Sequence, residues 1–269
     1  SWMEKPFIGA FVEQTLVFNG NDSASQPSIW PARSQGLVFG YQLLEVNGVS
    51  VQNSQALTNQ LDVLPAGALV ELKVKSPSGE IENVPVNLIT FPVRDRWVYH
   101  YVPYLIGLFY LASALWVFFL RRHTQEGRTF AVFAASVAIG IAALFDLYTT
   151  HVFSWLWTIS LALAGSAILT LPLVFPGEDP LVKRAPFLRW AAYAVGGLIA
   201  LASLIWLYDR SQPLLYAVFW KVEFAFAGLS FLSAILWMGF RRYPRTSHLE
   251  REQIRLILIS IGISFVPLA

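Results

Sequence analysis

The sequence predicts a two-part, multi-domain fold: a small β-rich α+β domain, followed by an all-α bundle of transmembrane helices. Of the 269 residues, 55% are apolar and only 13% are charged, whereas an ordinary soluble domain has about 25% charged residues. The charge also divides by position. Residues 1–96 hold 6 Lys+Arg and 9 Asp+Glu, and residues 97–269 hold 13 and 8. We therefore expect an acidic domain over 1–91, a junction over 92–100 and a basic, apolar bundle over 101–269.

The first 91 residues alternate short apolar segments with turns rich in Gly, Asn, Ser and Pro. The Asn47-Gly48 pair is a strong signal for a hairpin turn. Asn53 or Ser54 can cap a helix that runs to about Leu64, and its leucines at 57, 61 and 64 fall on one face. The predicted strands are 7–12, 15–18, 41–46, 69–74 and 81–88.

Residues 36–48 read Gly-Leu-Val-Phe-Gly-Tyr-Gln-Leu-Leu-Glu-Val-Asn-Gly. This stretch resembles the signature of PDZ domains, in which a Gly-Leu, a Gly-Asp and an Ile-Leu-x-Val-Asn-Gly strand follow one another. Pro65-Ala66-Gly67 and Val70–Val74 fit the bacterial form of the family. The resemblance covers about residues 6–90, and it departs from the pattern at Tyr41, where the family usually has Asp.

The resemblance implies a peptide-binding groove, because PDZ domains add an extended peptide to a sheet edge beside a helix. By this resemblance the backbone of a Gly-containing loop would hold the C-terminal carboxylate of a peptide or protein partner. The helix would supply the facing side of the groove. The alternative is a PDZ fold whose groove is filled and which only supports its neighbours. The implied peptide-binding residues are Phe7, Ile8, Gly9, Ala10, Ala56, Gln60 and Val63.

From residue 101 onward the chain is a series of long apolar runs, each close to the roughly 20 residues that a membrane-spanning helix needs. The lipid bilayer is therefore an expected partner. Small residues recur every four positions in two of these runs, at 134, 138 and 142 and at 192, 196 and 200, which predicts close helix packing. The six predicted spans are 101–120, 129–148, 152–175, 190–208, 214–240 and 254–269.

The loops predict the orientation of the chain. The segments 121–128, 183–189 and 241–255 together hold eleven Lys and Arg, whereas the loops at 148–152 and 208–214 hold only Arg210. Positively charged loops stay in the cytoplasm. Residues 1–96 are therefore predicted to be extracytoplasmic in a multi-pass membrane protein, and the resemblance to the bacterial form of PDZ domains implies that the membrane is the bacterial cytoplasmic (inner) membrane. Six spans leave Ala269 outside, so one more span would be needed to place a following domain in the cytoplasm, and a span before Ser1 would bring the N-terminus inside as well. We therefore expect a parent with about eight spans.

Three ionisable residues fall within or at the edge of the predicted spans: Asp146, Lys221 and Glu223. Charge inside a membrane is costly and often marks a functional pathway. Asp146 can instead be interfacial, and Lys221 can extend its ammonium group outward. Glu223 lies deepest, and it is two residues from Lys221, so the two side chains should point to different helix faces.

The order of an outer PDZ-like domain and a polytopic helical region resembles the input half of the competence quorum-sensing family of bacterial sensor histidine kinases. Leu171–Pro176, Arg251–Leu258 and Val266–Leu268 resemble short motifs of that family. The resemblance implies a sensory region of a two-component system, in which the head binds a peptide or protein and the kinase lies beyond Ala269. The short junction, with Arg94, Asp95 and Arg96, suits a rigid connection, and it equally suits a static anchor.

Several chemistries find no support in the residues. The chain has no cysteine, and none of its four histidines forms the His-Glu-x-x-His pattern of membrane metalloproteases. His248 lies in a short basic loop and is read as solvated. We find no catalytic motif and expect no metal, cofactor or nucleic acid. The alternatives left open are a non-signalling membrane scaffold, a protease component and a transporter component, and a homodimer is a candidate assembly.

Overall fold

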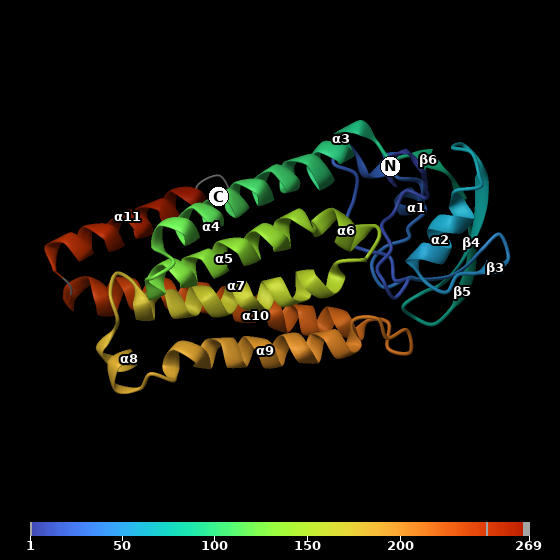
Figure 1. Ribbon diagram of the computed structural model, residues 1–269. Coiled ribbons are helices and arrows are strands. Elements are labelled where there is room, and N and C mark those ends of the chain that lie inside the picture. Colours follow the sequence, from blue (N-terminus) through green and yellow to red (C-terminus); the bar gives the residue numbers. More distant parts are fainter. Residues whose placement is uncertain (1, 246, 266–269) are drawn as a thin grey trace. The chain divides into compact units, whose positions relative to one another are not determined.

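The computed structural model describes residues 2–245 and 247–265 (Figure 1). It is mostly helical, at 61%, with a small region of six strands near the N-terminus. The chain divides into two compact units, which are described separately below. The first comprises residues 1–108, 139–158 and 202–219, and the second comprises 109–138, 159–201 and 220–269.

A four-stranded antiparallel sheet forms the centre of the N-terminal domain, in the order β3-β2-β4-β5. The predicted strands at 41–46, 69–74 and 81–88 are confirmed within one residue at each end. A separate two-stranded sheet pairs β1 with β6. The strands are β1 (Pro6–Phe7), β2 (Gln42–Val46), β3 (Val49–Ser50), β4 (Leu69–Lys75), β5 (Ile81–Asn87) and β6 (Ile89–Thr90).

The predicted strands at 7–12 and 15–18 were wrong in extent. β1 ends at Phe7, and beyond it only isolated bridges remain, between Val12 and Phe18 and between Val17 and Gln42. The backbone explains the interruption, because Gly9 has φ +77° and Leu16 has φ 64°. Both values lie in the left-handed region, which no extended strand can contain.

The predicted helix after the hairpin is confirmed as α2 (Ser54–Leu61). The side chain of Asn53 accepts a hydrogen bond from the backbone N–H of Ala56 at 2.8 Å, which caps the helix. α2 ends three residues earlier than expected, because Leu64 precedes Pro65 and the residue before a proline disfavours the helical conformation. At the hairpin, Asn47 and Gly48 both have positive φ, as the turn type requires.

Two clusters of buried side chains stabilise the domain. We call the first the aliphatic core; it lies between α2 and the four-stranded sheet and includes Leu43, Leu57, Leu61, Leu72 and Val86. We call the second the aromatic cluster, and it consists of the buried rings of Phe7, Phe11, Trp30 and Phe91. Partly buried rings from two helical segments pack against the aromatic cluster: Tyr99, Phe145 and Tyr148.

From Val93 onward, most of the described residues are helical. Among the described residues, four helical segments are long and apolar enough to cross a membrane: 93–121, 154–174, 188–206 and 215–242. They correspond to four of the six predicted spans. The helices are α1 (Pro31–Ser34), α3 (Val93–Arg96), α4 (Val102–Arg121), α5 (Gln125–Ala142), α6 (Leu144–Tyr148), α7 (Ser154–Val174), α8 (Pro180–Arg184), α9 (Leu188–Trp206), α10 (Leu215–Leu236) and α11 (His248–Phe265).

The two remaining predicted spans differ from expectation. The segment expected as one helix over 129–148 is divided at Ala143 into α5 and α6. The last one corresponds to α11, which starts six residues before 254. Residues 266–269, including the Val266–Leu268 motif, lie outside the described residues.

Small residues bring helices of the second unit close together, as their spacing predicted. A Cβ atom at Gly196 would lie 2.1 Å from the Ser166 hydroxyl. That hydroxyl donates a hydrogen bond to the carbonyl of Ala162, and it lies 3.0 Å from the carbonyl of Ala192 on α9. Any side chain larger than glycine at position 196 would therefore push α7 and α9 apart.

Candidate functional site

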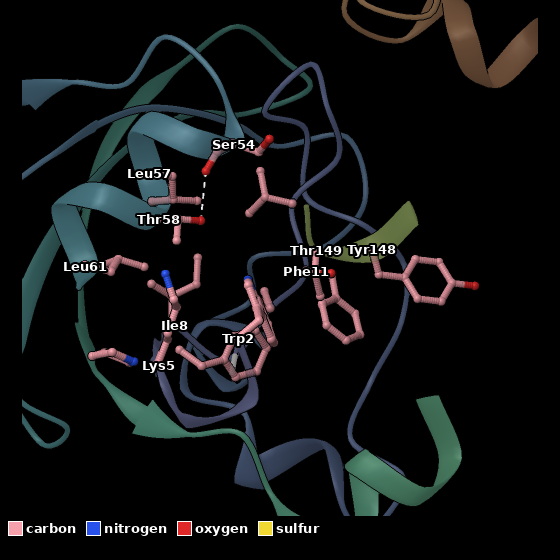
Figure 2. Close-up of a pocket in the computed structure, with 14 residues that line it drawn as sticks. Trp2, Lys5, Ile8, Phe11, Ser54, Leu57, Thr58, Leu61, Tyr148 and Thr149 are labelled. Atoms are coloured by element: carbon pink, nitrogen blue, oxygen red, sulfur yellow. Dashed lines mark hydrogen bonds between the residues drawn. The ribbon is translucent and has the colours of Figure 1, made fainter. Parts of the chain in front are cut away.

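A narrow groove runs between α2 and the segment 8–12 (Figure 2). Leu57 and Leu61 project from α2 toward Ile8, and Trp2 and Lys5 lie along the same opening. The cavity in the groove measures only about 40 Å³, which is room for a few water molecules. Its other lining residues are Pro6, Phe7, Ala10, Phe11, Val12, Ser54, Thr58, Tyr148 and Thr149.

The residues predicted to bind a peptide divide between the groove and its surroundings. Phe7, Ile8 and Ala10 line the cavity. Gly9 instead faces Pro31, whose Cδ would lie 2.2 Å from an added Cβ atom. This contact, together with its positive φ, explains why the loop carries glycine there.

The three residues of α2 that were predicted to face the peptide lie outside this cavity. Ala56, Gln60 and Val63 are not among the lining residues. The side chain of Val63 is 81% exposed, and the Gln60 amide donates to the carbonyl of Ser50 at 3.4 Å. Leu57 and Leu61 contribute both to the aliphatic core and to the lining of the groove. Peptide binding at these residues remains a prediction.

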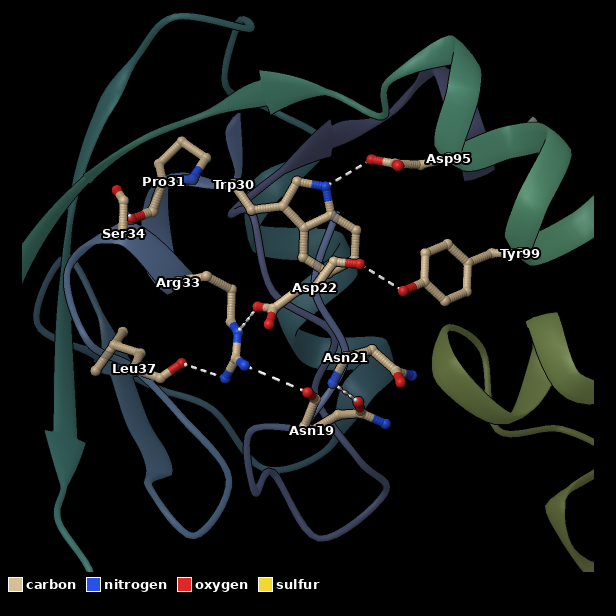
Figure 3. A network of polar contacts seen from close by, with 11 residues as sticks. Asn19, Asn21, Asp22, Trp30, Pro31, Arg33, Ser34, Leu37, Asp95 and Tyr99 are labelled. Carbon is tan, nitrogen blue, oxygen red and sulfur yellow. Dashed lines mark hydrogen bonds and ion pairs between the residues drawn. The ribbon is translucent and has the colours of Figure 1, made fainter. Parts of the chain in front are cut away.

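Asp95 is the centre of a buried polar network. The sequence analysis named Asp95 only as a residue of the junction and did not predict this network. Its side chain is 0% exposed. One carboxylate oxygen accepts the Trp30 indole N–H at 2.7 Å (Figure 3). The other accepts the Ala24 amide at 2.7 Å and the Ser23 hydroxyl at 3.2 Å. Hydrogen bonds to a charged group are about twice as strong as neutral ones. The sequence signal that could have pointed to this site is a single acidic residue, Asp95, between Arg94 and Arg96.

A second set of contacts attaches the polar loop at 20–31 to the start of the same helical segment. The Tyr99 hydroxyl donates to the carbonyl of Asp22 at 2.5 Å, and the Asp22 carboxylate lies 2.5 Å from the Arg33 Nε (Figure 3). Arg33 also donates to the carbonyls of Leu37 and Gly20 at 3.1 and 3.3 Å. Arg33 therefore fixes the loop through the Asp22 carboxylate and the Gly20 carbonyl, and Tyr99 fixes it through the Asp22 carbonyl.

Arg96 holds the opposite side of the junction. Its guanidinium group donates to the carbonyl of Phe91 at 3.1 Å and to the carbonyl of Met3 at 3.0 Å. The helical segment then continues from α3 through a π-helical turn at Trp97–Tyr101 into α4. The junction thus has no flexible linker between the domain and the first candidate span.

Glu13 is a buried carboxyl group that sequence reasoning did not single out. The residue is 5% exposed, and one of its oxygens accepts a hydrogen bond from the Asn19 amide at 2.7 Å. Its other oxygen has no hydrogen-bond partner among the described residues. Burial raises the pKa of Glu13 to about 7, and the Asn19 hydrogen bond opposes that rise.

The loop that carries Glu13 contacts two helix-connecting loops. The His151 Nε2 lies 2.8 Å from the carbonyl of Val12, and burial lowers the pKa of this imidazole. The Thr15 hydroxyl donates to the carbonyl of Pro213 at 2.8 Å. These bonds place a titratable carboxyl group where the domain meets the connecting loops.

The three predicted intramembrane ionisable residues have different surroundings. Asp146 accepts the amides of Val152 and Phe153 at 3.3 and 2.8 Å, so it stabilises the turn before α7. Lys221 is exposed and Glu223 is 0% exposed, which confirms that they lie on different faces of α10. Within the described part of the chain, no group of three or more His, Asp or Glu side chains could hold a metal ion.

Comparisons of this chain with protein families, with curated proteins and with solved structures give no match.

Proposed function

We propose that this chain is the sensory input region of a bacterial signal-transducing membrane receptor, of the sensor histidine kinase type. The β-rich domain would lie outside the cytoplasmic membrane as a PDZ-like ligand-binding head. The helices would carry its state inward to a kinase encoded beyond Ala269. The family resemblance of the sequence and the four candidate spans support this proposal.

The observation that carries the proposal is the buried Asp95 network. Asp95 lies in α3, at the start of the helical segment 93–121, which is the first candidate span. Its three hydrogen-bond donors all belong to the segment 23–30 of the head. A rearrangement of this segment would change the packing of the helix directly. A ligand could then shift the receptor between two states by its differential affinity for them.

The groove beside α2 supports a peptide or protein terminus as the ligand. Its walls are the face of α2 that carries Leu57 and Leu61, and the segment 8–12. Lys5 at its rim carries a positive charge that would attract a carboxylate. The Lys5 ammonium pairs with Asp62 at 2.5 Å.

A static scaffold is the second candidate, and the small size of the groove favours it. Trp2 and Tyr148 both line the cavity, which at about 40 Å³ leaves no room for a peptide side chain. A scaffold would use the same polar network to hold the head in place. The two proposals differ in whether a ligand can open the groove.

Titration of the purified full chain with a library of C-terminal peptides tests the ligand. We expect a subset of peptides to bind, and we expect Thr58→Arg, which places a charge in the groove, to abolish binding. Asn59→Arg is the matched control, because the adjacent Asn59 is exposed and does not line the cavity. Binding of no peptide at all would favour the scaffold.

The orientation of the chain in the membrane can be tested with single cysteine substitutions, because the chain has no cysteine of its own that would react. A single Ser78→Cys, in the exposed turn before β5, should react with a membrane-impermeant maleimide in intact cells. Arg122→Cys, in a basic loop, should react only after permeabilisation. The coding sequence beyond Ala269 tests the output: a histidine-kinase dimerisation and ATP-binding region would support the sensor, and an early stop codon would contradict it.

A further inference from the structure

The second unit contains a pocket of about 310 Å³ between α5, α7 and α9. Its polar lining is unusual, because every polar side chain in it can donate a hydrogen bond and none is a carboxylate. Such a lining would attract an anion and disfavour a cation. The polar lining residues are Gln125, Arg128, Thr129, Thr170, Arg189 and Tyr193.

The two arginines of the pocket have unused donor capacity. Arg128 is exposed, and its guanidinium group makes no ion pair or hydrogen bond with the described residues. Arg189 pairs with Glu178 at 3.3 Å, but its Nε is buried and has no acceptor in the described part of the chain. Guanidinium groups suit phosphate, because their planar fork matches its oxygens.

The backbone adds positive potential at the same place. α5 begins at Gln125 and α9 begins at Leu188, so Arg128 and Arg189 both lie in the first turns of long helices. The first turn of a helix carries a partial positive charge that favours anions. The two helix ends and the two cations therefore act in the same direction.

We propose that this pocket binds the phosphate group of an anionic phospholipid. The lipid, rather than free phosphate, is favoured by the apolar side chains beside the donors. Trp190 is 68% exposed and Val132 is 38% exposed, and both line the pocket where acyl chains could cover them. Basic pockets between membrane-spanning helices bind acidic headgroups in this way. The proposal requires that the helices lie in a bilayer, but it does not require a signalling output.

The test is the thermal unfolding midpoint of the purified full chain in mild detergent, during titration with phosphatidylglycerol, with phosphatidylcholine or with inorganic phosphate. We expect phosphatidylglycerol to raise the midpoint at concentrations where the other two probes do not. Arg128→Gln should weaken the apparent affinity for phosphatidylglycerol by about tenfold, since a hydrogen bond to a charged group of this kind is commonly that strong. Arg128→Gln combined with Arg189→Gln should abolish the selectivity.

The matched control is Arg122→Gln combined with Lys183→Gln, which removes the same charge from exposed residues that do not line the pocket. This control should keep the phosphatidylglycerol response. If the double pocket variant does not fold, Arg128→Gln alone decides, because the Arg128 side chain has no partner among the described residues to lose. Equal responses to the two lipids, an equal response to inorganic phosphate, or an unchanged response in Arg128→Gln would each overturn the proposal. A head on the other side of the membrane, or a non-kinase output, would leave the result unchanged.

Discussion

The aliphatic core and the aromatic cluster of the first unit differ in what they hold together. The aliphatic core lies between α2 and the sheet, so its side chains belong to the head. The aromatic cluster also receives rings from the helical segments, namely Tyr99, Phe145 and Tyr148. Tyr148 stacks on Phe11 with centroids 5.4 Å apart. The comparison suggests that the first cluster folds the head and that the second attaches it to the helices.

Removal of the central ring of the aromatic cluster should give the largest effect. Trp30 is 0% exposed and packs edge-on against Phe7 and Phe11, with centroids 5.2 and 5.0 Å away. Trp30→Ala should lower the free energy of unfolding by about 3–5 kcal/mol, as large-to-small core substitutions do. Hydrogen exchange should then rise in the amides of 93–99 as well as in those of the head.

Leu72→Ala is the matched change in the aliphatic core, since Leu72 is also 0% exposed. We expect a loss of about 2–5 kcal/mol. In this variant faster exchange should be confined to the sheet and α2, and the amides of 93–99 should keep their protection. Equal loss of protection in 93–99 for both variants would show that the two clusters form one cooperative unit.

The next effect depends on pH and concerns Glu13. Its folded pKa of about 7 lies above the ordinary value of 4.5, so between these values the folded chain binds more protons than the unfolded chain. Stability from this group is therefore fully present below about pH 4.5 and is lost as the pH rises to about 7. The expected loss is on the order of 3 kcal/mol.

Glu13→Gln should remove this pH dependence, because the amide keeps an oxygen to accept the Asn19 hydrogen bond but does not ionise. The measurement is the thermal midpoint of both forms from pH 4.5 to 8. Parallel curves for the wild type and the variant would contradict the assignment to Glu13.

Asp95→Asn should have a smaller but more specific effect. The substitution replaces a carboxylate that accepts three hydrogen bonds with an amide that has only one oxygen. The amide NH2 group would therefore face at least one N–H or O–H donor of the head. We expect a loss of about 1.5–3 kcal/mol, with faster hydrogen exchange at 23–25. Asp62→Asn is the control, because its pair with Lys5 is partly exposed; exposed ion pairs contribute about 0–1 kcal/mol.

The smallest effect is expected at the cap of α2. Asn53→Ala removes the hydrogen bond to the Ala56 amide, which should cost about 1 kcal/mol. The exchange of amides in the first turn of α2 should rise, whereas the amides of 93–99 should not change. An effect on 93–99 would mean that the groove and the junction are coupled.

The sequence predicted the elements whose signals are local. The Asn47-Gly48 turn, the Asn53 cap and the long apolar runs depend on neighbouring residues; the structure confirms the turn, the cap and four of the six predicted spans. The residues of α2 that were predicted to face a peptide, Ala56, Gln60 and Val63, do not line the cavity beside that helix, and peptide binding there stays a prediction. Asp95 and Glu13 were missed as buried groups for another reason: their burial depends on partners far along the chain, such as Trp30, 65 residues away from Asp95.

The central claim is that the Trp30–Asp95 hydrogen bond couples the head to the first helical segment. A double-mutant cycle with Trp30→Phe and Asp95→Asn tests it, because phenylalanine keeps an aromatic ring and removes only the indole donor. The measured quantity is the opening free energy of the amides at 93–99 from native-state hydrogen exchange. We predict a coupling energy of about 1–3 kcal/mol between the two changes. Simple additivity of the two changes would contradict the claim.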